Sequence, residues 1–195
     1  ELIGTVAGSE GVNLSLQITC DEGDEVIVLE PFYTNYNTFA FMNGITLKAV
    51  PTNIRNGFKV PEMSEFEKLI TPRTKAILIS NPGNPTGTLY TKENMLALGE
   101  VAKKHDLFLI SDEVYREFCY TDEPHFSAMN IPGLEQNVIL VDSVSKRYNL
   151  CGCRIGCILS HNKDRGDEIC PGTPLSSNLR PACRYRSAGH PSVLF

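Results

Sequence analysis

The sequence lacks any apolar run long enough to cross a membrane, and it has no charged-then-apolar leader at its start. Positive charge is also in short supply, because 18 Lys and Arg residues face 23 Asp and Glu residues for a net charge of −5. This balance argues against nucleic acid or an anionic membrane as the main partner. We therefore expect a cytoplasmic protein with small-molecule partners, no membrane association and no nucleic-acid ligand.

The densest group of cysteines comprises Cys151, Cys153 and Cys157. Their C-x-C-x3-C spacing matches no common zinc pattern, so we expect no metal site. The total of seven cysteines is odd and irregularly spaced. Buried free thiols in a reducing cytosol are the better interpretation.

Two other absences narrow the possible classes. No internal repeat is visible, and no G-x-G-x-x-G follows the first predicted strand, which disfavours a plain dinucleotide-binding module. The sequence opens within an element, at "ELIGTVAGSEG" without an initiator Met, so we expect an N-terminal segment to be missing. At 195 residues, the length allows one domain, or one domain and part of a second.

What the sequence does contain is a series of short, continuous apolar runs. Such runs are typical of strands buried on both faces of a parallel sheet. They are "DEVIVLE" (24–30), "ITLKAV" (45–50), "KAILIS" (75–80), "LFLIS" (107–111) and "NVILVD" (137–142).

Helical patterns lie between these runs. Residues 91–106 have Thr91 as a plausible N-cap, followed by one apolar face. That face comprises Met95, Leu98, Val101 and Ala102. A shorter helix is predicted over 62–70. The alternation predicts an α/β fold, a three-layer α/β/α domain with a mostly parallel sheet, over residues 1–162. Residues 163–195 are rich in Pro breaks and polar residues, and we expect a disordered tail there.

Ligands of open α/β sheets bind beyond the carboxyl ends of the strands, and three of the predicted strands end in unusual residues. The constrained loop "NPGNPTG" (81–87) carries Asn84, "DEVYREF" (112–118) carries Asp112 and Tyr115, and "SVSK" (143–146) carries Lys146. Singly, Asp112 is also compatible with an exposed N-cap, and Lys146 with an ordinary surface charge. Together they predict one rim at which a carboxylate and a lysine meet.

Two further stretches add phosphate-binding and aromatic groups to this rim. "AGSEG" (7–11) places Gly8 and Ser9 at a predicted helix start, where backbone N–H groups favour an anion. Arg154 is suited to clamp a phosphate, and "PFYTNY" (31–36) supplies aromatic rings. Phosphate donors, a carboxylate for a ring nitrogen, an aromatic face and a lysine are the requirements of a pyridoxal phosphate site.

The order of these motifs resembles a known family. The pattern S-x-S-K, an aromatic and then G-x-R-x-G is matched by Ser143, Ser145, Lys146, Tyr148, Gly152, Arg154 and Gly156. In these features residues 1–162 resemble the class I aminotransferases of the fold-type I pyridoxal-phosphate-dependent enzymes, in particular bacterial aspartate-aminotransferase-like members.

This resemblance implies catalytic roles for Lys146, Asp112 and Tyr115. Lys146 is expected to form the Schiff base with pyridoxal 5′-phosphate and to move the proton between substrate Cα and the cofactor. Asp112 is expected to pair with the ring nitrogen, and Tyr115 with the phenolic oxygen. The cofactor-binding set implied by the resemblance is Gly8, Ser9, Tyr33, Asn84, Asp112, Tyr115, Ser143, Lys146 and Arg154.

The resemblance also implies transfer of an amino group from an aspartate-like amino acid to a 2-oxo acid. Family members are expected to be homodimers of about twice this length. They carry a small C-terminal domain, which we expect to be absent here, along with its substrate-binding arginine. The same motifs also fit another fold-type I reaction, such as a C–S lyase or a cyclopropane-forming synthase. A third alternative is an inactive truncated remnant.

Overall fold

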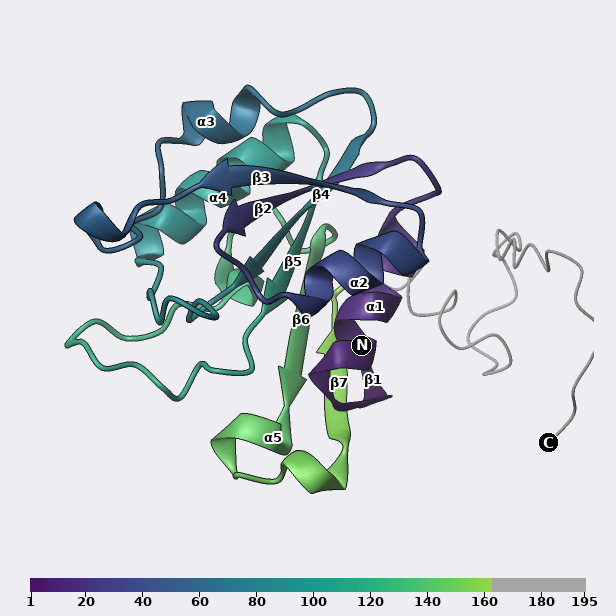
Figure 1. Cartoon of the computed structure of the whole chain (residues 1–195), viewed down its shortest axis with the longest axis vertical. Coiled ribbons are helices and arrows are strands. Elements are labelled where there is room, and N and C mark those ends of the chain that lie inside the picture. Colours follow the sequence, from purple (N-terminus) through teal and green to yellow (C-terminus); the bar gives the residue numbers. More distant parts are fainter. Residues whose placement is uncertain (163–195) are drawn as a thin grey trace, which may run out of the picture.

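A seven-stranded sheet runs through residues 1–162, which are the residues described in this computed structural model (Figure 1). The tail predicted over 163–195 lies outside the described residues. The strands are β1 (Leu2–Val6), β2 (Glu25–Glu30), β3 (Thr46–Pro51), β4 (Thr74–Ser80), β5 (Phe108–Asp112), β6 (Val138–Ser143) and β7 (Ile155–Leu159). Their order is β1-β7-β6-β5-β4-β2-β3, and β7 runs antiparallel to both of its neighbours. Every other adjacent pair is parallel.

Helices cover both faces of the sheet, which confirms the predicted α/β/α layering (Figure 1). One face carries α1 (Ala7–Thr19) and α2 (Asn35–Met42), and the other carries α3 (Met63–Glu67) and α4 (Lys92–Lys104). The single-turn helix α5 (Val144–Arg147) follows β6 directly. Three short 3-10 helices complete the described elements: η1 (Ile54–Asn56), η2 (Ala128–Asn130) and η3 (Cys151–Cys153).

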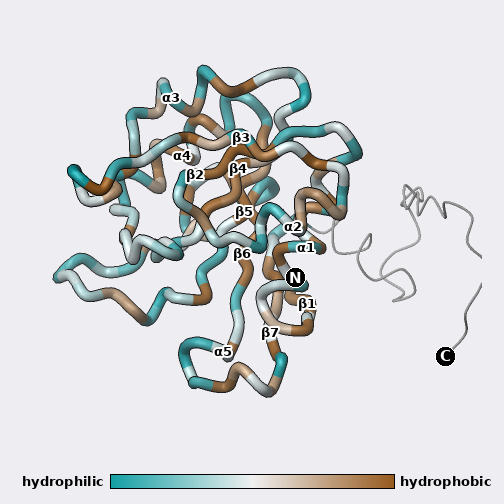
Figure 2. Tube along the Cα trace, in the orientation of Figure 1, coloured by the Kyte–Doolittle hydropathy of each residue, from teal (hydrophilic) through white to brown (hydrophobic). Residues whose placement is uncertain are grey.

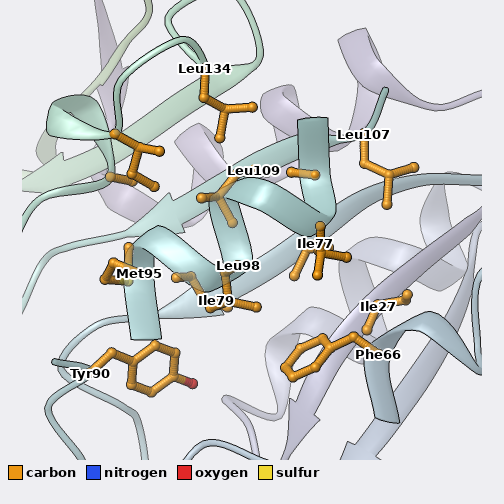
Figure 3. Packing of buried hydrophobic residues seen from close by; sticks show 14 of the residues in the cluster. Ile27, Phe66, Ile77, Ile79, Tyr90, Met95, Leu98, Leu107, Leu109 and Leu134 are labelled. Carbon is orange, nitrogen blue, oxygen red and sulfur yellow. The ribbon is translucent and has the colours of Figure 1, made fainter. Parts of the chain in front are cut away.

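The central strands are buried on both faces because their side chains alternate between two apolar clusters. In β2, Ile27 packs with the α4 side and Val28 with the α1 side. Figure 3 shows the α4 side, where Met95 and Leu98 lie over apolar residues of the central strands. Figure 2 shows the same hydrophobic centre as brown segments of these strands among teal loops. Burial of each Leu or Ile side chain contributes about 1.5–3 kcal/mol to the stability of the fold. The strands are held in place by this packing, and so are their ends, which form the site.

The five predicted strands and the α4 helix are confirmed, with ends that differ by one or two residues. Thr91 caps α4 in a reciprocal arrangement with Asn94, and the predicted apolar face is buried. The helix predicted over 62–70 is shorter, Met63–Glu67. Strands β1 and β7 and helix α2 were not predicted, because each is short and residues 31–36 and 152–156 were interpreted as binding motifs with no secondary structure assigned.

The prediction of buried thiols is wrong for Cys151 and Cys153, which are exposed. Both belong to η3, in the connection between α5 and β7. Cys20, Cys119 and Cys157 are half-buried, and all five described cysteines are free thiols. Within residues 1–162, no helix is both long enough and apolar enough to cross a bilayer.

Candidate active site

A cavity of about 210 Å³ opens at the carboxyl ends of β5 and β6, beside the start of α1. All nine residues predicted for the cofactor site line this cavity, although they come from six separate stretches of the chain. The lining comprises Ala7, Gly8, Ser9, Val12, Tyr33, Phe39, Asn84, Asp112, Val114, Tyr115, Ser143, Ser145, Lys146, Cys151 and Arg154. The fold therefore brings the predicted phosphate-binding, aromatic, acidic and lysine groups into one place.

Asp112 is the last residue of β5 and is buried rather than exposed, which rules out the alternative of a solvated N-cap. Its Oδ2 accepts a hydrogen bond of 2.9 Å from the Tyr36 hydroxyl, and its Oδ1 accepts one of 3.4 Å from Val114 N. Burial raises the pKa of Asp112 to about 6, while the Tyr36 hydrogen bond and the nearby Lys146 act in the opposite direction. At neutral pH this carboxyl group is therefore mainly ionised.

Lys146 lies in the single turn of α5, directly after the end of β6. The turn is capped by Ser143, whose Oγ accepts a hydrogen bond of 3.0 Å from Ser145 N. The Lys146 ammonium lies 5.6 Å from the centre of the Tyr115 ring, within the range of a cation–π contact. Lys146 is exposed, so its amine is open to the cavity and to solvent.

One end of the cavity is the start of the 13-residue helix α1. Val6 provides no side-chain cap, and Gly8 and Ser9 of the first turn line the cavity. The first N–H groups of a helix have no partner within the helix, and they favour an anion. Gly156 packs against this turn: a Cβ there would lie 2.5 Å from the carbonyl carbon of Ala7. Ala7 N also donates a hydrogen bond of 3.2 Å to the carbonyl oxygen of Arg154. The second glycine of the G-x-R-x-G motif thus lets β7 approach the helix start.

Ser145 gives an independent indication that a polar ligand belongs in this cavity. Its Oγ is buried and has no hydrogen-bond partner among the described residues. A buried hydroxyl without a partner costs about 1–3 kcal/mol. Because Ser145 lines the cavity beside Ser143 and Arg154, an oxygen-rich anionic group there would satisfy it. The donor set therefore fits a phosphate.

Hydrogen bonds within and beside the "NPGNPTG" loop constrain its conformation, as its composition predicted. The Ser80 hydroxyl donates to Pro82 O at 3.0 Å, and Gly83 N donates to Thr88 O at 2.8 Å. Gly87 adopts a φ of 70°, which favours glycine. These contacts hold Asn84 at the cavity.

Two buried groups behind the site were not predicted, Glu113 and His125. One Glu113 oxygen accepts hydrogen bonds from Ser111 Oγ at 3.0 Å, Ser127 Oγ at 3.1 Å and Ala128 N at 2.9 Å. The other oxygen lies 3.6 Å from His125 Nε2. Burial raises the pKa of Glu113 to about 7 and lowers the pKa of His125. No sequence signal identified this pair, because its members meet only through the fold.

The protein is thus a three-layer α/β protein with a cavity at the strand ends. This cavity contains Lys146 and a set of hydrogen-bond donors that fits a phosphate. The family model described as "Aminotransferase class I and II" matches residues 2–184, and the chain belongs to this family. The match continues beyond residue 162, where the resemblance carried by the sequence motifs ends.

Individual relatives agree with this assignment. The putative aminotransferase YugH of Bacillus subtilis is 36% identical over 156 residues, and the aspartate/prephenate aminotransferase of Thermus thermophilus is 38% identical over 156 residues. Each alignment covers 80% of this chain and 40% of the relative, so the chain spans about 40% of the length of these curated relatives.

Solved structures give the same result. The aspartate aminotransferase of Thermotoga maritima superposes with a TM-score of 0.80 at 32% identity, over 85% of this chain and 44% of that one. The Thermus thermophilus aspartate aminotransferase with maleate gives a TM-score of 0.77 at 37% identity, over 84% of this chain and 42% of that one. The predicted fold class is thereby confirmed.

Proposed function

We propose that this chain provides the cofactor-binding part of a pyridoxal-phosphate-dependent aminotransferase, with residues 1–162 as its large domain. The reaction moves an amino group from an amino acid to a 2-oxo acid. The observation that carries the proposal is the convergence of Lys146 and Asp112 on one cavity that also presents an anion-binding end. Membership of the aminotransferase family supports it.

The residues present fit pyridoxal 5′-phosphate. The helix start at Gly8 and Ser9, with Ser143 and Arg154, would hold the phosphate, and Ser145 would gain the partner that its buried hydroxyl lacks. Tyr33 supplies an aromatic face for the ring. When bound, this cofactor supplies an aldehyde for attachment to a lysine and a ring that withdraws electrons from the substrate.

Asp112 would pair with the ring nitrogen of the cofactor and keep it protonated. Its pKa of about 6 leaves it ionised at neutral pH, and an ionised carboxylate keeps a neighbouring pyridinium nitrogen protonated. The Tyr36 hydrogen bond fixes the orientation of this carboxylate. Asn84 and Tyr115 line the same cavity and would donate to the phenolic oxygen.

Lys146 has two tasks, covalent attachment of the cofactor and proton transfer at the substrate Cα. Its ammonium lies over the Tyr115 ring, which limits the positions that the flexible side chain adopts. The Lys146 amine would accept the proton from the substrate Cα as a base and deliver it to the cofactor.

The proposed amino donor is aspartate or a similar amino acid, and the proposed assembly is a homodimer. Support for the donor comes from relatives named as aspartate aminotransferases, including that of Geobacillus stearothermophilus at 37% identity. Because the chain spans about 40% of that relative's length, these statements extend to the whole protein only as proposals.

Product analysis tests the reaction. The purified protein is incubated with pyridoxal phosphate, aspartate and 2-oxoglutarate, and amino acids and oxo acids are quantified. Aminotransfer predicts equal amounts of oxaloacetate and glutamate, and the Lys146→Ala variant should form neither. Release of ammonia or of a sulfur-containing product without glutamate, using suitable substrates, would instead indicate a lyase-type member. A wild-type chain that forms no product from any amino donor would contradict the proposed activity.

A further inference from the structure

Four charged side chains form a network directly behind the candidate active site. They are Arg116, Glu117, Asp142 and Arg147, and none of them lines the cavity. The roles proposed above for the cavity residues do not use this network.

Asp142 is the centre of the network. Its Oδ2 lies 3.0 Å from Nη2 of Arg116 and 3.0 Å from Nη2 of Arg147. Its Oδ1 accepts a hydrogen bond of 2.8 Å from the backbone N–H of Ser143. The Asp142 carboxylate is therefore satisfied by two guanidinium groups and one backbone donor, and charge-assisted bonds of this kind are about twice as strong as neutral ones.

The two arginines are sequence neighbours of cavity residues. Arg116 follows Tyr115, and Arg147 follows Lys146. Across the cavity wall, the Lys146 ammonium faces the Tyr115 ring at 5.6 Å. The same two segments are thus joined twice, once at the cavity and once behind it through Asp142.

Neither segment has enough local structure to fix itself. Lys146 belongs to the four-residue helix α5, and Tyr115 belongs to a turn over residues 114–117. A single helical turn is marginal without tertiary contacts, because nucleation fixes several dihedral angles for one hydrogen bond. Asp142, in contrast, belongs to the buried central strand β6. It is the point at which both segments are anchored to the sheet.

Burial distinguishes Asp142 from an ordinary surface ion pair. The side chains of Asp142 and Arg147 are 13% and 18% exposed, whereas that of Glu117 is 57% exposed. Glu117 Oε1 lies 3.5 Å from Arg147 Nε and 3.7 Å from Arg116 Nε. Exposed pairs contribute little, but removal of one partner from a buried pair leaves the other uncompensated.

We propose that Asp142 is a positioning residue that holds Tyr115 and Lys146 in register at the cofactor cavity through Arg116 and Arg147. This inference rests on the proposed function, because it assigns a purpose to the alignment of the cofactor-binding residues. It predicts that loss of the Asp142 charge disturbs the site more than the fold.

The test compares Asp142→Asn with Glu117→Gln, which removes the exposed carboxylate of the same network. Each protein is mixed with pyridoxal phosphate and reduced with borohydride, and the rate of labelling at Lys146 is measured by peptide mapping. The visible circular dichroism of the bound cofactor reports the orientation of its ring, and thermal melting reports folding. Asp142→Asn should label Lys146 roughly ten-fold more slowly or worse, with a weakened dichroism band. Glu117→Gln should match the wild type.

Rescue separates positioning from general destabilisation. Asp142→Glu keeps the charge and should recover part of the labelling rate and dichroism. If Asp142→Asn does not fold, Arg147→Lys provides the same test, because it keeps the charge but loses the planar guanidinium. Absence of Lys146 label in the wild type would contradict the proposed function itself. The positioning role alone would be overturned if Lys146 is labelled in the wild type and the variants melt at a lower temperature but label Lys146 at the wild-type rate, with the same dichroism.

Discussion

The Tyr36 hydroxyl donates a hydrogen bond of 2.9 Å to Oδ2 of Asp112, across 76 residues of sequence. Both groups are buried, and Tyr36 lies in α2 while Asp112 ends β5. The hydrogen bond stabilises the ionised form of the carboxyl group against the effect of burial. The charge state of the proposed ring-nitrogen partner is thus set from a neighbouring helix.

Tyr36→Phe should raise the pKa of Asp112 above its present value of about 6. A hydrogen bond to a charged group contributes about 1.5–3 kcal/mol, so we expect an increase of about one unit or more. Since the carboxylate form is required, the acidic limb of the pH–rate profile should move to higher pH. Tyr33→Phe is the control, because its hydroxyl contacts only the exposed Asn35 side chain among the hydrogen bonds described. Identical profiles for Tyr36→Phe and the wild type would argue against this coupling.

Asp112→Ala should lower the rate of aminotransfer more than it weakens cofactor binding. The ring nitrogen would lose its proposed partner and with it the proton that makes the ring an electron acceptor, whereas the phosphate contacts proposed for Ser143 and Arg154 would be kept. Turnover and the dissociation constant of pyridoxal phosphate are measured on the same preparation. Near-normal turnover would refute the role assigned to Asp112.

Glu113→Gln should change how stability depends on pH. The pKa of Glu113 is about 7 in the folded protein against an ordinary 4.5, so between these values the folded state holds a proton that the unfolded state has lost. Stability due to Glu113 therefore falls as pH rises through this window, by roughly 3 kcal/mol in total. Glutamine cannot ionise, so the wild type should lose stability relative to the variant between pH 4.5 and 8.

Urea denaturation at several pH values measures this difference directly. Glu100→Gln serves as the control, because that side chain is 73% exposed and pairs only with Lys103 among the described ion pairs. A constant difference between wild type and Glu113→Gln across the window would show that Glu113 does not titrate as described.

Gly156→Ala should damage both the fold and the phosphate end of the cavity. The new Cβ would lie 2.5 Å from the Ala7 carbonyl carbon, a backbone atom that cannot move aside independently. We expect a loss of about 1–3 kcal/mol in unfolding free energy and weaker binding of pyridoxal phosphate. Gly152→Ala is the matched control, since nothing lies within 4 Å of a Cβ there. Equal stability of the two variants would contradict the close approach of β7 to α1.

The main elements of the site were predictable because they follow continuous apolar runs. Asp112 is the last residue of β5, and Lys146 lies in the single helical turn that follows β6, so parallel pairing of the two strands brings both residues to one rim. The capping pattern at Thr91 likewise predicted the start of α4 from local chemistry.

The supporting groups were not predictable in this way. Tyr36 contacts Asp112 only because α2 packs on the sheet, and residues 31–36 were interpreted only as a source of aromatic rings. Glu113 follows Asp112 in sequence, but its carboxylate accepts a hydrogen bond from Ala128 N and does not line the cavity. Asp142 was assigned only as the end of a strand. Such roles depend on tertiary contacts that leave no periodic pattern in the sequence.

The most direct test of the account is to map the lysine that reacts with pyridoxal phosphate. The protein is incubated with the cofactor, and the absorption band of lysine-linked cofactor is recorded. Borohydride then fixes the linkage, and the labelled peptide is mapped. The account predicts stoichiometric label on Lys146, lost when excess inorganic phosphate competes for the site. Label spread over other lysines, or none at all, would contradict the assignment of this cavity as the cofactor site.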